Sequence, residues 1–526
     1  MLSQRIISLR KKFSMSQEKM AEIFNVSRQS VQKWESGAAV PDVEKLIAMA
    51  RHFKVSLDFL LCDEDNRSVE EQRLDREIIP QYKSAKEWEL YSSSLSTEYD
   101  QCIDEGKDVE NLKGLFDSIS ALEPSKEKEQ MADVLFNIIR NAKTKADYRY
   151  NEPSDYDSIQ NLLTDFDADL TKVPTDDVLY NKIKGAWVGR ICGCLLGKPI
   201  ECIYTEELIP LLKETGNYPM HRYIRNADLN EDIYKKYRFQ LRDKCYEDTI
   251  TAAPVDDDTN YVVMAQVLIE KYGRDFTAKD VANLWLERQP KDAYCTAERV
   301  AFMNFVNGYC PPDSAEYKNP YREWIGAQIR GDYYGYINPG DIKTAAKMAF
   351  KDASISHVKN GIYGEMFISA MIAAAAVLDD VKQVILAGLS QIPKTSRLYC
   401  EITKLIKDFD GGLTQEKCFE NIHKQYDQHV SHDWCHTISN AVIVCAALLY
   451  GKGDYSKSIC MAVQTGFDTD CNGATVGSVI GMMKGIDGIE KRWYQPINNK
   501  LETSIFGVGT IDIDEAVNKT IEHINR

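Results

Sequence analysis

The sequence lacks three features that would direct its function elsewhere. Its 14 cysteines include no Cys-x-x-Cys pair, so neither a zinc ribbon nor a thioredoxin-type motif is supported. The longest apolar runs, around residues 366–378 and 441–450, are shorter than the stretch of about 20 residues that spans a bilayer. No signal peptide opens the chain. We therefore expect a cytoplasmic protein with reduced thiols and no membrane association.

An overall excess of positive charge is also missing. The net charge over 526 residues is −16, yet residues 1–61 carry +4, which leaves −20 for the remainder. An acidic body with a mildly basic head predicts that only the head contacts a polyanion. The length predicts about two to four domains. We expect a head at 1–61, a helical connector at 62–147, with helices within 64–78 and 124–148, and a large body at 148–526.

Helix start and stop signals fill the head. Ser16 and Ser27 precede two short amphipathic segments, and the second segment ends at Gly37. Val31 and Trp34 would face inward. The opposite face would then carry Arg28, Gln29, Gln32 and Lys33. Arg and Gln side chains pair well with guanine and adenine edges, although a small protein-interaction domain would also expose such a polar face.

The pattern S-x-x-x-[AM]-x-x-x-x-V-S-x-x-x-[IV]-x-x-W-E-x-G…P in residues 3–61 resembles the helix-turn-helix of phage repressor and Cro proteins. The resemblance implies a five-helix domain that binds a DNA operator. It implies that helix 28–36 lies in the major groove and that Gln17 contacts the DNA backbone. Such domains usually bind two half-sites as dimers, which makes a homodimer a candidate assembly.

Small residues recur at every fourth position in two parts of the body. The stretch "NKIKGAWVGRICGCLLGKPIE", residues 181–201, carries glycine at 185, 189, 193 and 197. Residues 473, 474, 477 and 481 repeat the pattern with glycine and alanine. Such a stripe on a helix lets another backbone approach closely. Close packing leaves Glu201 unexplained, and a carboxylate facing a cavity could act as a general base or orient a substrate.

Two clusters of acids stand before helical segments. Asp256, Asp257 and Asp258 are consecutive, and Asp468 and Asp470 lie in "GFDTDCNG". One acid at each site could cap a helix and favour its dipole, so ordinary capping is one interpretation. The surplus acids favour another, in which two helix N-termini converge on divalent cations that prefer hard oxygen ligands.

At these residues the chain resembles the ADP-ribosylglycohydrolase superfamily, which includes the dinitrogenase reductase-activating glycohydrolases. The family's G-x-x-x-G-x-x-x-G-D-x-x-G…E element corresponds to Gly185–Glu201, its T-D-D-T to residues 256–259, and its G-G-D-T-D-T to residues 466–471. A Thr/Ser-His pair between them corresponds to Ser356-His357. The resemblance implies an all-α fold, a large orthogonal helical bundle whose cleft holds two Mg²⁺ or Mn²⁺ ions.

The resemblance also implies roles for individual residues. The metal ligands would be Asp256, Asp257, Asp258, Asp468 and Asp470. Glu201 would lie by the ribose or the attacking water, and the base would be Glu201 or a metal-bound carboxylate such as Asp257 or Asp470. His357 and Asn360 would contact the substrate, with a buried structural histidine as the alternative for His357.

Three positions depart from the family pattern. Asp256 and Cys471 replace threonines, and Cys194 replaces an aspartate. These changes question specificity for arginine-linked ADP-ribose more than they question metal binding. We therefore expect hydrolysis of an N- or O-glycosidic bond of a small or protein-linked ADP-ribosyl or related ribosyl group. The alternative is a ligand-sensing transcriptional regulator with little or no turnover.

Overall fold

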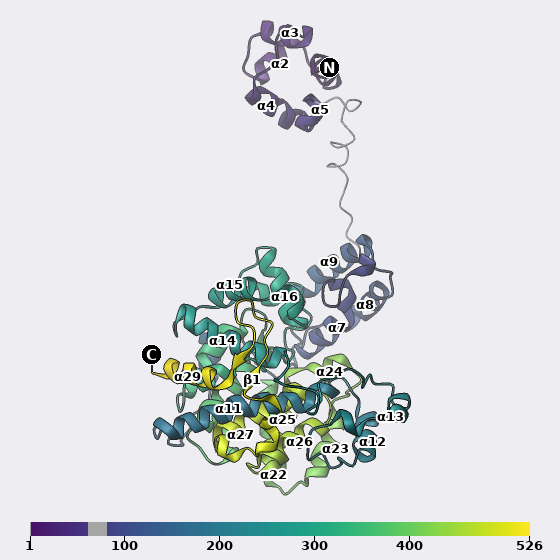
Figure 1. The fold of residues 1–526 in the computed structure, drawn as a ribbon. Coiled ribbons are helices and arrows are strands. Elements are labelled where there is room, and N and C mark those ends of the chain that lie inside the picture. The colour runs from purple at the N-terminus through teal and green to yellow at the C-terminus, as the bar shows by residue number, and fades with distance from the viewer. Residues whose placement is uncertain (1, 62–81, 526) are drawn as a thin grey trace. The chain divides into compact units, whose positions relative to one another are not determined.

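Helices make up almost all of the regular structure in the computed structural model, which describes residues 2–61 and 82–525 (Figure 1). The described strands are two, β1 (Lys500–Leu501) and β2 (Ile511–Asp512), which pair antiparallel. The all-α prediction is confirmed. Within the described ranges no helix has the length and apolarity needed to cross a bilayer. The contacts divide the chain into two units, residues 1–81 and 82–526.

The head contains the five helices that the repressor resemblance implies. They are α1 (Leu2–Lys12), α2 (Gln17–Ile23), α3 (Arg28–Ser36), α4 (Val43–Phe53) and α5 (Leu57–Leu61). Ser16 accepts a hydrogen bond from the Lys19 amide, Ser27 accepts one from the Ser30 amide, and Gly37 ends α3 in the left-handed conformation. The predicted caps are thus confirmed.

Residues 82–147 are mostly helical and pack around a small apolar cluster of their own. Their elements are η2 (Tyr82–Ser84), η3 (Tyr91–Ser94), α7 (Leu95–Asp104), η4 (Glu110–Leu112), α8 (Lys113–Ser120) and α9 (Lys126–Arg140). The helix expected within 124–148 is α9, whereas the one expected within 64–78 lies outside the described residues. Arg322 of the body binds Glu98 at 3.0 Å and Glu105 at 2.7 Å, so buried ion pairs attach α7 to the body.

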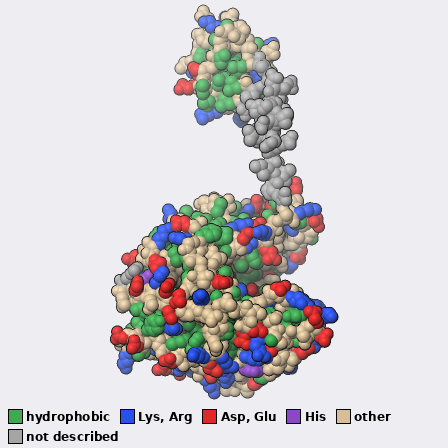
Figure 2. All heavy atoms as spheres, in the orientation of Figure 1, with side chains coloured by type: hydrophobic (Ala, Val, Ile, Leu, Met, Phe, Trp, Pro, Cys, Tyr) green, Lys and Arg blue, Asp and Glu red, His purple; other side chains and the backbone are tan. Residues whose placement is uncertain are grey.

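The body is a bundle of helices around one large core. Its first half comprises α10 (Tyr156–Gln160), α11 (Asp176–Gly197), η5 (Lys198–Ile200), α12 (Thr205–Glu214), η6 (Asn226–Asp228), α13 (Glu231–Lys236), α14 (Asp257–Tyr272), α15 (Ala278–Arg288), η7 (Lys291–Ala293), α16 (Thr296–Val306), α17 (Asp313–Glu316) and α18 (Asp332–Tyr336). Its second half comprises α19 (Ile342–Ala353), α20 (Lys359–Ala375), α21 (Val381–Leu389), α22 (Arg397–Asp410), α23 (Gln415–Gln425), α24 (Ser431–Cys435), α25 (Thr437–Gly451), α26 (Tyr455–Gln464), α27 (Thr469–Lys484), η8 (Ile486–Gly488), α28 (Lys491–Tyr494), η9 (Gln495–Ile497) and α29 (Ile513–Ile524). Acidic and basic side chains alternate over its visible face (Figure 2).

Helices α11 and α27 lie side by side and run antiparallel, with backbone against backbone (Figure 1). Gly189 faces the carbonyl of Gly477, and Gly193 faces that of Gly473. A Cβ built on any of these four glycines would lie closer to the opposing carbonyl oxygen than the 3.0 Å that real Cβ atoms respect. The predicted glycine stripe is therefore a direct helix–helix contact, and both helices must keep it bare.

Replacing Gly189 with alanine should destabilise the body. The new Cβ would press on the Gly477 carbonyl, which belongs to a helix backbone and has no room to move aside. Overpacking of this kind costs roughly 1–3 kcal/mol, seen as a lower thermal midpoint in calorimetry. Gly114→Ala on α8 is the matched control, since its Cβ would meet nothing within 4 Å. Equal midpoints for the two variants would contradict the contact.

Candidate active site

The contact between α11 and α27 brings an acidic residue from the end of one helix to the acidic start of the other. Gly197, the last residue of α11, abuts Thr469 and Asp470 in the first turn of α27. The Thr469 hydroxyl donates to the Gly197 carbonyl at 3.0 Å. Glu201 follows one short helical turn later. The negative charge of Asp470 is the largest cause that raises the pKa of Glu201, as expected for carboxylates held close together.

Four of the predicted acids line one cleft. Glu201, Asp257, Asp468 and Asp470 face a cavity of about 450 Å³, a size typical of small-ligand sites. Glu298 of α16 lines it as well. The four predicted acids come from three separate chain segments, so the convergence expected from the sequence is present in the fold.

The remaining two predicted acids, Asp256 and Asp258, are buried and paired with cations. Lys198 donates to Asp256 Oδ2 at 2.6 Å. Arg190 donates to Asp258 Oδ1 at 2.8 Å and to Asp332 Oδ2 at 2.9 Å. Asp256 Oδ1 also caps α14 by accepting the Asp258 amide at 2.9 Å. Two cations from the α11 segment thus hold the N-terminus of α14 in place.

Burial makes the cleft costly for negative charge. It raises the pKa of Asp257 to about 8, with Asp256 adding to the effect, and it raises the pKa of Glu298 to about 7. The pKa values of Asp258, Asp468 and Asp470 are raised for the same first reason. A cation that binds beside these carboxyl groups would stabilise their ionised form.

The donor atoms fit an oxygen-preferring divalent ion. Asp258, Asp470 and Cys471 each offer an atom, and these atoms lie within 4.8 Å of one another. Asp258 Oδ2 and Asp470 Oδ1 are buried without a hydrogen-bond partner. Burial raises the pKa of the Cys471 thiol, so its sulfur stays protonated and is a poor ligand. Mg²⁺ and Mn²⁺ both prefer the carboxylate oxygens that remain.

A second group, Asp104 with His432 and His436, also has metal-like spacing, but its hydrogen bonds argue against a metal. Nδ1 of His432 accepts the Trp324 indole N–H, and Nδ1 of His436 accepts the Ile438 amide. Each neutral ring therefore keeps its hydrogen on Nε2, and these nitrogens face Asp104 at 3.3 Å and 3.7 Å. A nitrogen that carries a hydrogen cannot ligate. The group is two histidines gathered around one carboxylate, to which His432 makes a hydrogen bond.

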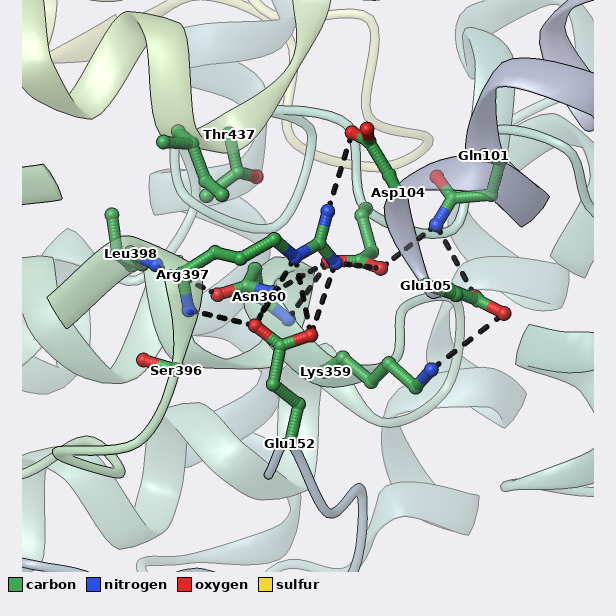
Figure 3. Close-up of polar contacts among 12 residues, drawn as sticks. Gln101, Asp104, Glu105, Glu152, Lys359, Asn360, Ser396, Arg397, Leu398 and Thr437 are labelled. Atoms are coloured by element: carbon green, nitrogen blue, oxygen red, sulfur yellow. Dashed lines mark hydrogen bonds and ion pairs between the residues drawn. The ribbon is translucent and has the colours of Figure 1, made fainter. Parts of the chain in front are cut away.

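Two predicted substrate contacts lie away from this cleft. The Asn360 side chain donates to Glu152 and Glu323, each at 2.8 Å, and accepts the Leu398 amide, all beside Arg397 (Figure 3). His357 is 1% exposed, and its Nδ1 lies 2.8 Å from the Ser356 hydroxyl. Its Nε2 lies 4.0 Å from Glu298. The structure therefore places His357 behind a cleft residue, and Asn360 in a separate buried polar network.

The predicted DNA-contacting face of α3 is open. Arg28, Gln29, Gln32 and Lys33 are exposed, while Val31 and Trp34 are buried. Arg28 pairs with Glu18 at 2.9 Å. Gln17, at the start of α2, donates to Glu35 at 2.6 Å.

Four residues of the site were not predicted from the sequence motifs. Arg190 and Lys198 stand among the glycines of α11 and its extension, where either resembles an ordinary surface cation. Glu298 lies in no motif at all. Trp88 also lines the cleft, although it comes from the segment before α7. Of these four, only Lys198 lies close in sequence to a predicted site residue, three positions before Glu201.

Comparisons with known proteins match a different family to each part of the chain. A sequence model of the ADP-ribosylglycohydrolase family matches residues 175–523, and one of a helix-turn-helix family matches residues 6–60. A solved structure described as an ADP-ribosylglycohydrolase-related protein complex aligns with 66% of this chain and 98% of its own, at 14% identity and a TM-score of 0.39.

The curated relatives match the head. The HTH-type transcriptional activator BcrR of Enterococcus faecalis is 36% identical over 63 residues, which are 12% of this chain and 31% of that protein. The uncharacterized HTH-type transcriptional regulator YobD of Bacillus subtilis (strain 168) is 32% identical over 76 residues, 14% of this chain and 68% of that protein. The chain thus spans under a third of BcrR and about two thirds of YobD.

The metal-free protein should lose stability as the pH rises from about 5 to 8. The folded-state pKa values of Asp257 and Glu298, about 8 and 7, exceed the unfolded values of about 4. The folded state therefore binds more protons in this window, and the free energy of unfolding falls as they leave, by up to about 1.4 kcal/mol per pH unit for each proton.

Thermal midpoints measured in EDTA across this range check the effect. Asp257→Asn should flatten the slope, because the amide does not titrate. Asp117→Asn, an exposed position on α8, is the control and should keep the wild-type slope. An unchanged slope in Asp257→Asn would be evidence against a charged cluster at this position.

Proposed function

The chain belongs to the ADP-ribosylglycohydrolase family, and we propose that it is a metal-dependent hydrolase of a glycosidic bond in an ADP-ribosyl or related ribosyl substrate, joined to a DNA-binding head. One observation carries the proposal. Carboxylates from three chain segments meet in a single cleft, and Asp258 is buried beside Asp470 of that cleft. Asp258 Oδ2 and Asp470 Oδ1 have no hydrogen-bond partner. Most buried polar groups have a hydrogen-bond partner, so unpartnered oxygens on two neighbouring acids favour a cation between them.

The proposed metal ligands are Asp258 and Asp470, with Asp257 and Asp468 beside them at the cleft surface. A divalent ion at this place would position ribose hydroxyls or water and polarise the oxygens that it binds. Asp256 is left out of the set, because both of its oxygens already accept hydrogen bonds from protein groups.

Carboxylates suit the transition state of this reaction. Glycosidic cleavage develops positive charge on the sugar as the bond to the leaving group breaks. Fixed negative groups in a water-poor cleft stabilise that charge without reorganising. Glu201, held across from Asp470 at the end of α11, is the proposed base that takes a proton from the attacking water. The negative charge of Asp470 raises the pKa of Glu201, which makes the ionised carboxylate a stronger base.

The head supports a regulatory setting for this chemistry. Helix-turn-helix domains place the second helix of the motif in the major groove; here the motif is α2 and α3. The corresponding α3 exposes Arg28, Gln29, Gln32 and Lys33, which together suit base edges and phosphates. We propose these four as the DNA contacts, with Gln17 near the DNA backbone.

A second function, ligand sensing, is favoured by the residues that complete the cleft wall. Glu87 and Trp88 line the cleft, although they precede the matched family region and directly follow the stretch that joins the head in sequence. Arg299 holds both, because its Nη1 donates to the Glu87 carbonyl at 3.2 Å and its guanidinium lies 4.8 Å from the Trp88 ring centre. Trp88 has a φ of 64°, a strained conformation for a bulky residue that often marks functional segments. A bound ligand would press on this segment.

Removing the proposed base or a proposed metal ligand should strongly slow turnover. Glu201→Gln and Asp470→Asn should each lower kcat by about 10²–10⁴-fold, measured as release of ADP-ribose or ribosyl product from ADP-ribosylated peptide, ADP-ribose esters or nucleosides in the presence of Mg²⁺. Glu420→Gln, exposed on α23, should leave the rate unchanged. Wild-type rates in Glu201→Gln would refute its role as the base.

If the cleft also senses ligand, ADP-ribose should change DNA affinity. With an operator selected from random DNA, ADP-ribose should shift the Kd of the wild type by about fivefold or more. Trp88→Ala should lose most of that shift, and Trp88→Phe should keep it. Fluorescence anisotropy reads the Kd directly. An operator Kd that is the same with and without ADP-ribose in the wild type would rule the sensing function out.

A further inference from the structure

The acidic cluster contains two metal-like groups that share one residue. Cys194, Asp256 and Asp258 form the first, and Asp258, Asp470 and Cys471 form the second. In each group the three donor atoms lie within 4.8 Å of one another. The family resemblance implies two ions, so the two groups offer a place for each. They differ in whether protein cations already occupy their oxygens.

In the first group all the carboxylate oxygens but one are taken. Asp256 Oδ2 accepts the Lys198 ammonium at 2.6 Å, and its Oδ1 accepts the Asp258 amide. Asp258 Oδ1 accepts Arg190 at 2.8 Å. What remains is Asp258 Oδ2, which the second group shares, and the sulfur of Cys194, a soft atom that hard divalent ions do not favour. Lys198 itself is fixed by η5, the rigid Lys-Pro-Ile turn that continues α11, and its side chain is only 24% exposed.

In the second group the oxygens are free. Asp258 Oδ2 and Asp470 Oδ1 have no hydrogen-bond partner, and the two residues are 0% and 2% exposed. An ionised carboxylate oxygen that is buried and unpaired is costly. No described lysine or arginine donates to either oxygen. This is the position that a bound cation would complete.

We propose that the Lys198 ammonium takes the place of one of the two divalent ions, so that the cleft binds a single ion through Asp258 and Asp470. The inference rests on the proposed metal-dependent function and specifies its ion count.

Asp256, which departs from the family pattern, and Lys198 compensate each other in charge. Asp256 stands where the family has a neutral threonine, and it adds one negative charge to a crowded cluster. The Lys198 ammonium on that carboxylate adds one positive charge. Together they leave the charge of the cluster unchanged, whereas either one alone would shift it by a full unit. An ammonium also brings no coordination shell to fill, so it fits where a hexacoordinate ion would need further oxygens.

Metal stoichiometry tests the inference. The full-length protein, stripped with EDTA and dialysed against Mn²⁺, is analysed for bound metal per chain by elemental analysis. The wild type should bind one Mn²⁺. Lys198→Met keeps the length of the side chain but removes the charge, which frees Asp256 Oδ2, so this variant should bind two. Lys198→Arg keeps a cation at this position and is the matched control, with one Mn²⁺ expected.

Electron paramagnetic resonance of the Mn²⁺-loaded wild type gives a readout that needs no variant. One ion should give the spectrum of an isolated Mn²⁺, whereas two adjacent ions would show exchange coupling. Two ions in the wild type, or one ion in a folded Lys198→Met, would overturn the inference and leave the proposed function standing. No ion in the wild type would overturn both. If Lys198→Met fails to fold, the wild-type count and spectrum decide.

Discussion

The backbone contact between α11 and α27 is the constraint on which the site depends. Because Gly189 and Gly193 lie against Gly477 and Gly473, the two helices have almost no freedom to slide or separate. Their antiparallel direction then fixes which ends meet, and these are the ends that carry Glu201 and Asp470. The centre of the contact is made by glycine backbone and not by large side chains. It therefore leaves the acids at the helix ends free for a ligand, which a contact made by large side chains would crowd out.

A second constraint is electrostatic. Acids gathered in a buried cleft repel one another and resist ionisation, so the fold supplies cations at defined places. Arg190 neutralises Asp258 and Asp332 from within α11, and Lys198 neutralises Asp256 just beyond the end of that helix. Neither cation donates a hydrogen bond to Asp258 Oδ2 or Asp470 Oδ1. In the network around Arg397, by contrast, Glu152 and Glu323 both pair with the guanidinium (Figure 3).

Local patterns in the sequence predict much of this arrangement. Glycine at every fourth position predicts the close helix contact, and acids before small-residue helices predict that helix starts converge. Ion pairs cannot be read in the same way, because Lys198 reaches Asp256 across 58 residues and Arg190 reaches Asp332 across 142. His357 and Asn360 fail for a related reason. They stand together at the start of α20, yet one faces Glu298 and the other faces Glu152, and no local period encodes that difference. Trp88 lies outside the family region entirely.

The central claim is that Asp258 and Asp470, 212 positions apart in the sequence, hold one divalent cation between them. Anomalous diffraction from crystals of the full-length protein grown with Mn²⁺ tests it most directly. We expect one manganese peak within ligand distance, about 2.0–2.6 Å, of Asp258 Oδ2 and Asp470 Oδ1, with the Lys198 ammonium still on Asp256. A fully loaded crystal with no peak there, or with a peak against Asp256 in place of Lys198, would contradict it.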